Sequence, residues 1–467
     1  MSRILLLGMS PLPTENETRT LGPGKRTWQF TKPLLDHGHR ICLITARHAA
    51  AYQDDGLPPI VAEELGNLVH YSVEQTVFER RTWLQSIHDH FRPRAIVGAT
   101  VYPSAMACRL MTDRPIWADL FGHTMAEAQS KCLVFADDYY LFHFWSFEQA
   151  VLDRADLLSV VSTPQGYATT GELGTRGRMN RRSAGYEFIR LVPCAVDVQE
   201  LGPSEEQRTR LRGRLFGDDD FIILWSGGYN TWSDIDTLFE ALERVMAVEP
   251  RVRFVSTGGQ IDGHDEITYP RFLRRIAGSP WRDRFLMQDW LPLEDVPAYW
   301  AESDLAINVD RSVYESRLGS RNRILDWMAS GLPIVTSRLC ELSQIIEHEG
   351  LGQTFEAGDV EGLQRVLLEA VRNPDRLQRW ADRARSYALE HFSYEATTQP
   401  LVEWLEDPRR APDADQRIPL ELASRPAGAG RLRRFRSSLR DRLRATGPWG
   451  TARWILAKRS RDQRSRS

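Results

Sequence analysis

Long apolar runs and paired cysteines are both missing from this sequence. Its 467 residues include five cysteines, which are scattered along the chain without a CxxC pair. This spacing argues against the common zinc motifs and is typical of reduced thiols in the cytoplasm. No apolar stretch approaches the roughly 18 residues that a membrane-spanning helix requires. The sequence therefore predicts a cytoplasmic protein with neither a zinc site nor a membrane-spanning segment.

An excess of positive charge is absent from most of the chain. The net charge is −3, but residues 431–467 contain 13 lysines and arginines against two acidic residues. This tail therefore carries +11, and the preceding 430 residues carry −14. A body this acidic is poorly suited to bind nucleic acid, so we expect no nucleic-acid partner.

Short apolar runs alternate with helix-length segments in two series. Buried strands of a parallel α/β sheet read as such runs, because helices cover both faces of the sheet. The first series is Ile4–Leu7, Ile41–Thr45, Ala95–Val97, Ile116–Ala118 and Leu157–Val161. The second series is Phe221–Trp225, Val252–Ser256, Leu305–Val309 and Pro333–Thr336.

Two series of similar size predict two doubly wound, Rossmann-like domains that face each other across a cleft. In such sheets the ligand lies at the carboxyl ends of the strands. We expect a first domain at 1–198, a second at 199–390, a closing helix at 391–407 and a basic, Pro/Arg-rich tail at 408–467.

The segment 320–335 combines a helix with a strand directly behind it. Ser320 is the expected N-cap of this helix, and Gly331 is suited to end it in a left-handed conformation. Three arginines crowd the start of the helix: Arg317, Arg321 and Arg323. Free amides at a helix start attract phosphate, and cations there would be repelled by the helix dipole unless an anion lay between. The pattern indicates a diphosphate site, with solvated surface arginines as the alternative.

Several segments resemble the family 4 group of retaining GT-B glycosyltransferases. The most specific is Leu325–Val335, which is similar to the family's Glu-Ala-Met-Ala-x-Gly-x-Pro-Val-Val element. The weaker matches are Gly22–Gly24 followed by Gly38–His39, Val192–Asp197, and Leu224–Gly228. The resemblance spans roughly residues 1–405. It implies a GT-B fold, an acceptor-side first domain, a nucleotide-sugar donor in the second domain, retention at the anomeric carbon, and no metal or other cofactor.

The resemblance also implies two acidic residues in the second domain. Family members usually have two glutamates with seven residues between them, the first near the donor sugar and the second on the ribose hydroxyls. Asp326 stands at the second position, whereas Leu318 occupies the first. Either the preceding loop is three residues longer and Glu315 serves, which we favour, or the first carboxylate has been lost.

A cation pair of the family is missing as well. The segment Gly228–Asp234 has neither the Arg nor the Lys that neutralises the leaving diphosphate in the family. We expect an arginine of the 317–323 cluster to replace them, Arg323 above all, with an ion pair between Arg323 and Asp326 as the alternative.

The complete set of expected donor-binding residues is Gly24, Gly227, Gly228, Trp232, Gly259, Arg317, Arg321, Asn322 and Asp326. For Trp232 and Gly259, packing and a plain turn are the alternatives.

In the first domain, Asp119 and His123 follow a buried strand and so lie at a carboxyl end. His123 is a candidate to contact the donor sugar or the reacting hydroxyl, and a structural histidine is the alternative. Glu127 would orient it or be a surface residue. We expect His123, Glu315 and Arg323 to form the catalytic set.

The Asp234-x-Asp236 motif has the form that binds metal in another glycosyltransferase fold. Here it begins a predicted helix, where acidic residues are favoured by the helix dipole and Ser233 can act as the cap. We therefore assign no metal ligands.

The tail segment 431–458 spaces leucines and aromatics at helical intervals among arginines. Such a helix suits an anionic membrane surface, and a disordered basic tail is the alternative.

Together these features predict a glycosyltransferase that acts on a glycan, lipid-linked or small-molecule acceptor, in the cytoplasm or at the inner face of the membrane. A non-catalytic partner subunit and a sugar-nucleotide epimerase are the competing interpretations.

Overall fold

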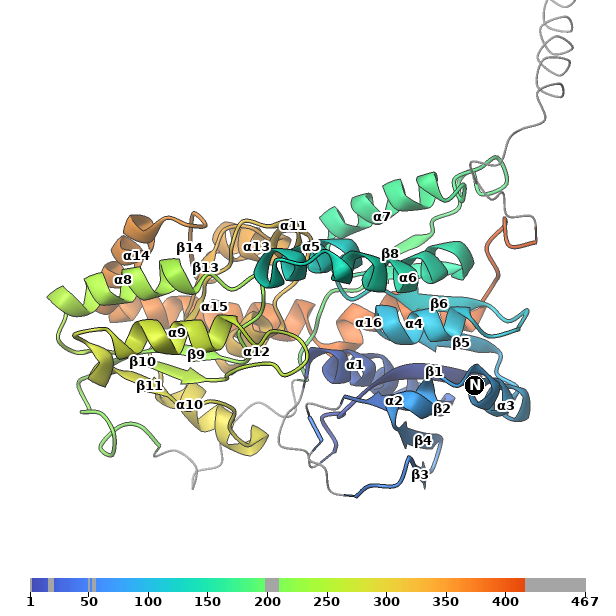
Figure 1. The fold of residues 1–467 in the computed structure, drawn as a ribbon, viewed down its shortest axis with the longest axis horizontal. Coiled ribbons are helices and arrows are strands. Elements are labelled where there is room, and N and C mark those ends of the chain that lie inside the picture. The colour runs from blue at the N-terminus through green and yellow to red at the C-terminus, as the bar shows by residue number, and fades with distance from the viewer. Residues whose placement is uncertain (1, 16–20, 49–50, 53–55, 198–209, 416–467) are drawn as a thin grey trace, which may run out of the picture. The chain divides into compact units, whose positions relative to one another are not determined.

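A computed structural model describes residues 2–15, 21–48, 51–52, 56–197 and 210–415. Within residues 1–417, which form one compact unit, the chain builds two separate β-sheets that are flanked by helices (Figure 1). Of the helices in the described residues, none is long and apolar enough to cross a membrane. The basic segment 431–458, for which we predicted a membrane contact, lies outside the described residues.

The first sheet has eight strands in the order β3-β4-β2-β1-β5-β6-β7-β8. Their bounds are β1 Arg3–Ser10, β2 Arg40–Arg47, β3 Ile60–Leu65, β4 Leu68–Val73, β5 Ala95–Gly98, β6 Ile116–Asp119, β7 Leu157–Val160 and β8 Ile189–Leu191. All neighbours pair in parallel except β3 and β4, which form an antiparallel edge. Between β1 and β5 the direction of winding reverses, which is where a sheet of this kind opens a crevice.

The second sheet has six parallel strands in the order β11-β10-β9-β12-β13-β14. Their bounds are β9 Phe221–Ser226, β10 Val252–Thr257, β11 Phe285–Met287, β12 Leu305–Asn308, β13 Ile334–Ser337 and β14 Gln353–Phe355. Numbered within the domain, this is the 3-2-1-4-5-6 order of the Rossmann fold, with its reversal between β9 and β12.

Helices cover both faces of each sheet. In the first domain they are α1 Gly22–Asp36, α2 Gln75–Phe78, α3 Arg81–Phe91, α4 Val101–Cys108, α5 Thr124–Phe135, α6 Tyr139–Arg154 and α7 Thr163–Thr175. In the second they are α8 Ile235–Val248, α9 Thr268–Ala277, α10 Val296–Glu302, α11 Tyr314–Leu318, α12 Asn322–Ser330, α13 Glu341–Glu349, α14 Val360–Arg372 and α15 Pro374–His391, with 3-10 turns at Arg282–Arg284 and Leu293–Asp295.

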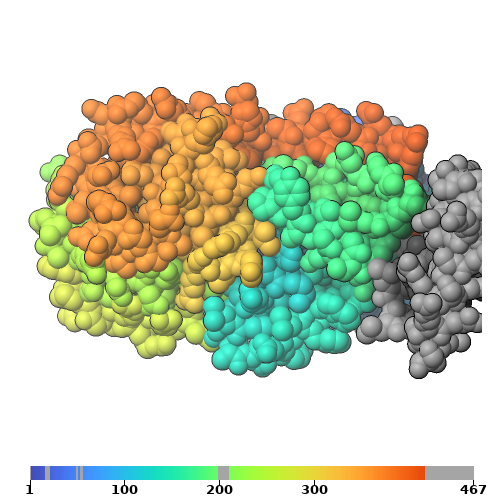
Figure 2. Space-filling model, turned by 90° about the horizontal axis from the view of Figure 1, so that it is seen from above, coloured from blue at the N-terminus to red at the C-terminus, as the bar shows by residue number. Residues whose placement is uncertain are grey.

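The last helix, α16 (Tyr394–Glu406), returns to the first domain. It packs against α1, and its Leu401, Val402 and Leu405 are buried in the core around Phe30. Figure 2 shows the orange surface of the C-terminal helices continuing from the second domain onto the first. The two segments that connect the domains are hydrogen-bonded to each other, because the Val196 amide donates to the Phe392 carbonyl at 2.9 Å.

The structure confirms the two Rossmann-like domains, and each predicted strand corresponds to an observed strand whose ends agree within three residues. The antiparallel hairpin β3–β4 and the short strands β8, β11 and β14 were not predicted. The cap expected for the helix in segment 320–335 was wrong: α12 begins at Asn322 with Arg321 as its N-cap, so Ser320 lies outside the helix. Gly331 ends α12 in the left-handed region, at φ 76°, as expected.

Candidate functional site

A cavity of about 400 Å³ lies at the carboxyl ends of both sheets. Its lining comes from the start of α1 and the segment after β6 in the first domain, and from the loops after β9 and β10, α10 and the start of α12 in the second. Of the predicted site residues, nine line this cavity: His123, Gly227, Gly228, Trp232, Glu315, Arg321, Asn322, Arg323 and Asp326. Three others, Gly24, Gly259 and Arg317, are not among its lining residues.

Two helix N-termini meet at this cavity. Gly22 begins α1 and Asn322 begins α12, and a Cβ atom at Gly22 would lie 3.2 Å from Nδ2 of Asn322. The N-cap residues are Leu21 and Arg321, whose side chains contain no hydrogen-bond acceptor. Neither first turn contains an acidic residue. The partial positive charge of both helix ends is therefore directed at the same space without a side-chain cap.

Arg323 is the arginine whose charge faces this space. Its guanidinium stacks over Trp225, 4.6 Å from the ring centre, and Nη2 donates to the Gly228 carbonyl. Nη1 is buried and has no hydrogen-bond partner among the described residues. Burial lowers the pKa of Arg323 to about 10, so it is still charged at neutral pH. The alternative that we considered, an ion pair with Asp326, is not formed.

Arg321 is engaged in a different way. Its Nε lies 2.7 Å from Asp310 Oδ2, and its Nη2 lies 2.8 Å from Glu315 Oε2, all three side chains being buried. Burial raises the pKa of Glu315 to about 7 although Arg321 opposes this shift. Because both carboxylates hold its donors, Arg321 is placed to fix Glu315 at the cavity wall rather than to bind a diphosphate.

Asp326 pairs with a residue that the sequence did not single out. Its Oδ2 lies 2.7 Å from Nζ of Lys25 in α1, so this ion pair joins the first domain to the second. Both side chains line the cavity. Asp326 and Arg323 lie three residues apart on α12 and so share one side of the helix.

The predicted glycines play two kinds of role. Gly227 has φ 95°, which L-residues rarely adopt, and a Cβ there would lie 3.7 Å from the Arg323 guanidinium. At Gly24 and Gly259 a Cβ would lie within 2 Å of the Pro11 carbonyl and of Asp289 respectively. These two glycines allow close packing of the backbone away from the cavity lining, and a direct contact with the nucleotide stays a prediction for them.

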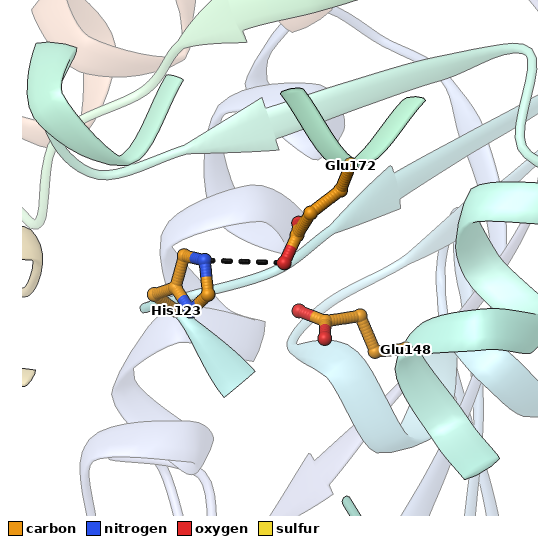
Figure 3. Close-up of side chains that lie close together, drawn as sticks. All are labelled: His123, Glu148 and Glu172. Atoms are coloured by element: carbon orange, nitrogen blue, oxygen red, sulfur yellow. Dashed lines mark ion pairs between the residues drawn. The ribbon is translucent and has the colours of Figure 1, made fainter. Parts of the chain in front are cut away.

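His123 is paired with a carboxylate from another helix (Figure 3). Its Nε2 lies 3.2 Å from Oε1 of Glu172 in α7, and its Nδ1 accepts from the Ala126 amide as the N-cap of α5. Burial lowers the pKa of His123, but the hydrogen bond and charge of Glu172 and the charge of Glu148 outweigh it and raise the pKa above its usual value. We had considered that Glu127 orients His123, but its carboxylate lies next to His264 instead.

Glu148, in α6, points toward the same histidine and Glu172 (Figure 3). It is 3% exposed, and its Oε1 has no hydrogen-bond partner among the described residues. Burial and the charge of Glu172 raise the pKa of Glu148 to about 7. Potential ligand atoms of His123, Glu148 and Glu172 lie within 4.8 Å of one another, so this group has the composition of a cation site. Protonation of Glu148 would relieve the repulsion between Glu148 and Glu172 as well as a bound cation would.

Glu127 and His264 are further titratable side chains that line the cavity. Glu127 Oε1 lies 3.8 Å from Nδ1 of His264, and Lys131 donates to the His264 carbonyl at 2.8 Å. Burial lowers the pKa of His264 to about 3 and raises that of Glu127. A neutral imidazole and a carboxyl group therefore face the cavity here, and both can hydrogen-bond to hydroxyl groups.

The Asp234-x-Asp236 motif begins helix α8, as expected. The cap, however, is Asp234, which accepts from the Thr237 amide, and not Ser233. Asp236 forms ion pairs with Arg271 and Arg275. The motif thus has a structural explanation.

Comparison with known proteins shows what the chain is similar to. Residues 220–373 match the family model described as glycosyl transferases group 1. The chain is 20% identical over 353 residues to the candidate glycosyltransferase YtcC of Bacillus subtilis (strain 168), covering 73% of this chain and 83% of YtcC. The second domain therefore matches the group 1 glycosyltransferases, and this chain is a glycosyltransferase. The family resemblance predicted from Leu325–Val335 is thereby confirmed.

Solved structures confirm the GT-B fold of this glycosyltransferase. Sucrose-phosphate synthase from Thermosynechococcus elongatus superposes with a TM-score of 0.66 at 16% identity, covering 87% of this chain and 98% of the other. HepE of Anabaena, in a complex with UDP and glucose, superposes with a TM-score of 0.62 at 16% identity, covering 87% and 100%. At such low identity the likeness concerns the fold, and the site must be argued from the residues present here.

Proposed function

We propose that this glycosyltransferase transfers a sugar from a nucleotide-sugar donor, with retention of configuration, to a glycan, lipid-linked or small-molecule acceptor. The observation that carries the proposal is the guanidinium of Arg323, which lines the cavity and whose buried Nη1 has no hydrogen-bond partner among the described residues. A buried cation without an acidic partner is costly, and an anionic ligand would remove that cost.

The two helix N-termini favour a diphosphate as this anion. Backbone amides at the starts of α1 and α12 would donate to phosphate oxygens, and Arg323 would neutralise charge between them. Loss of the nucleoside diphosphate places negative charge on the leaving phosphate, where fixed donors stabilise the transition state most. Asp326 is a suitable acceptor for the ribose hydroxyls, one helical turn further along α12.

The sugar and the acceptor would occupy the part of the cavity nearer the first domain. His123 and Glu315 line this space from opposite domains, and Glu315 is held in place by Arg321. Both side chains can hydrogen-bond to sugar hydroxyls. Glu127 and His264 are further candidates for contact with the acceptor because they face the same cavity.

Retention and independence of metal ions belong to the same proposal. Their support is the resemblance of Leu325–Val335 to the retaining family 4 element, together with the structural role of Asp234 and Asp236. The configuration of the product can be read from its anomeric proton coupling. Activity in the presence of EDTA tests the second point.

Nucleotide binding is the first experiment. Thermal shifts of the full chain would be measured with UDP, GDP, ADP and dTDP and their common sugars, without metal and then with Mg²⁺. Stabilisation by one nucleotide class is expected, of about 2.7 kcal/mol at a hundredfold excess over Kd. The structural likeness to HepE, which was solved with UDP and glucose, makes UDP-glucose a natural first donor. Binding without sugar transfer to any acceptor would favour a non-catalytic partner subunit, and release of free nucleotide with an altered sugar would favour an epimerase.

A further inference from the structure

Lys25 offers the cavity a positive charge that no motif predicted. The lysine and arginine side chains that line the cavity are Lys25, Arg321 and Arg323. Arg321 is matched by two buried carboxylates, Asp310 and Glu315. That leaves Arg323 and Lys25 as the cations able to meet a ligand. The diphosphate of a nucleotide sugar carries two negative charges, so one arginine alone would leave it half neutralised.

The position of Lys25 fits this need. It lies in the first turn of α1, three residues after Gly22, whose backbone approaches Asn322 at the start of α12. Its Nζ lies 2.7 Å from Asp326, one helical turn from Arg323. The Lys25 side chain is 29% exposed and that of Asp326 15% exposed, so the pair is not locked in the core. A change of lysine rotamer can move the ammonium group toward the start of α12, because four rotatable bonds give this side chain its reach.

The partner of Lys25 is itself a donor-binding candidate. If the ribose hydroxyls bind to Asp326, they compete with the ammonium group for the same carboxylate oxygens. The loop after β9, where the family has its cations, cannot provide a replacement. Tyr229 of that loop is fully buried against Trp225, and the other residues from Gly228 to Asp234 include no lysine or arginine.

We propose that Lys25 exchanges Asp326 for the diphosphate of the donor when the nucleotide binds, so that the acceptor-side domain supplies the second cation for the leaving group. This inference rests on the proposed function. Binding would then couple ribose recognition to charge neutralisation, because the event that engages Asp326 also frees Lys25. It would also place phosphate ligands on both domains.

The test compares nucleotides that differ by one phosphate. Isothermal titration calorimetry would give Kd for UDP, GDP, ADP and dTDP and for the corresponding monophosphates, at fixed ionic strength, with the wild type and Lys25→Met. The variant should weaken binding of the preferred diphosphate about tenfold, as expected for a charge-assisted contact, and leave the monophosphate within about twofold.

Lys32→Met is the matched control. Lys32 lies two turns further along α1, is 26% exposed, and pairs with Asp197 at 2.6 Å outside the cavity lining. Removing it abolishes a similar ion pair and should change neither Kd. An effect of Lys32→Met equal to that of Lys25→Met would overturn the specific role of Lys25.

A double-mutant cycle separates the exchange from a simple support of Asp326. In Asp326→Asn, Lys25→Met should still weaken diphosphate binding, because the lysine acts on the phosphate. If Lys25 only orients Asp326, its replacement will have no further effect in that background. If it only blocks Asp326, Lys25→Met alone will bind both nucleotides more tightly. Either of these results, or an unchanged diphosphate Kd, would overturn the inference. Failure of the wild type to bind any nucleotide would refute the proposed function together with it.

Discussion

Arg321 and Glu315 form a buried ion pair, in which Nη2 of the arginine lies 2.8 Å from Oε2 of the glutamate. The same guanidinium binds Asp310 just after β12. Glu315 thus belongs to a rigid group that fixes the loop between β12 and α12. Glu315 lines the cavity, as the interpretation of a loop three residues longer than the family spacing requires, and that interpretation stays a prediction.

We expect Arg321→Met to destabilise the fold strongly. The substitution leaves two buried carboxylates without their cation, and breaking a buried pair on one side typically costs about 3–5 kcal/mol. Urea denaturation followed by fluorescence measures the change in the free energy of unfolding. Arg338→Met is the control, because Arg338 pairs with Glu347 on the surface and such pairs contribute about 0–1 kcal/mol. Equal effects of the two substitutions would contradict the structural role of Arg321.

Arg323→Met should act on ligand binding more than on stability. Loss of a charge-assisted contact predicts that affinity for the preferred nucleoside diphosphate falls by about 10- to 100-fold. The unfolding free energy should not fall as it does in Arg321→Met, because the Arg323 guanidinium has no acidic partner to leave behind. Arg317→Met, which removes an exposed arginine outside the cavity lining, should leave the affinity unchanged. A wild-type Kd in Arg323→Met would refute the diphosphate assignment.

Glu148 makes stability depend on pH. Its pKa of about 7 in the folded protein lies above the ordinary value of 4.5, so the folded state binds this proton more tightly than the unfolded state does. The stabilisation is complete below about pH 4.5 and is lost as the pH rises through 7, a difference of about 3 kcal/mol at most.

Glu148→Gln should remove that part of the slope, since the amide cannot ionise. Unfolding free energies at pH 5.5 and 8 should therefore differ less in the variant than in the wild type. Glu187→Gln changes a carboxylate that is 78% exposed and should keep the wild-type slope. An unaltered slope in Glu148→Gln would show that this carboxyl group titrates normally.

The Glu172 carboxylate raises the pKa of His123 through a hydrogen bond and its charge. Glu172→Gln should therefore lower the pKa of His123, which the ring resonances report in an NMR titration once assigned with His123→Gln. Glu127→Gln is the informative control, because Glu127 faces His264 instead and should leave the pKa of His123 in place. A shift of equal size in both variants would contradict the pairing in Figure 3.

The pattern of apolar residues within single segments predicted the fold well. Buried parallel strands are nearly continuous apolar runs, so Ile4–Leu7 or Leu305–Val309 can be recognised without any knowledge of their neighbours. The hairpin strand β3 was missed because its residues Ile60–Leu65 are mostly exposed and mix apolar with acidic side chains. The Ser320 cap was misplaced by one residue, which a local pattern seldom resolves.

The site was predictable only in part. The helix start at Asn322 and its arginines were visible, and Arg323 was preferred for the diphosphate, but the sequence did not reveal that Arg321 binds two buried carboxylates. Lys25 and Asp326 are 301 residues apart, and Glu172 approaches His123 from another helix. Such pairings depend on how the sheets bring distant helices together. The one available signal for Lys25 was its position directly after the Gly22–Gly24 turn.

Because α16 returns to the first domain, two segments of the chain connect the two domains. A backbone hydrogen bond between Val196 and Phe392 ties the two connections together, so we expect an opening of the cavity to involve both of them. A single linker would let the domains twist freely, whereas two tied segments favour a swing about one axis. The same connection makes the first domain incomplete by itself, since the apolar face that Leu401 and Leu405 cover would be open to water in a fragment ending at residue 198.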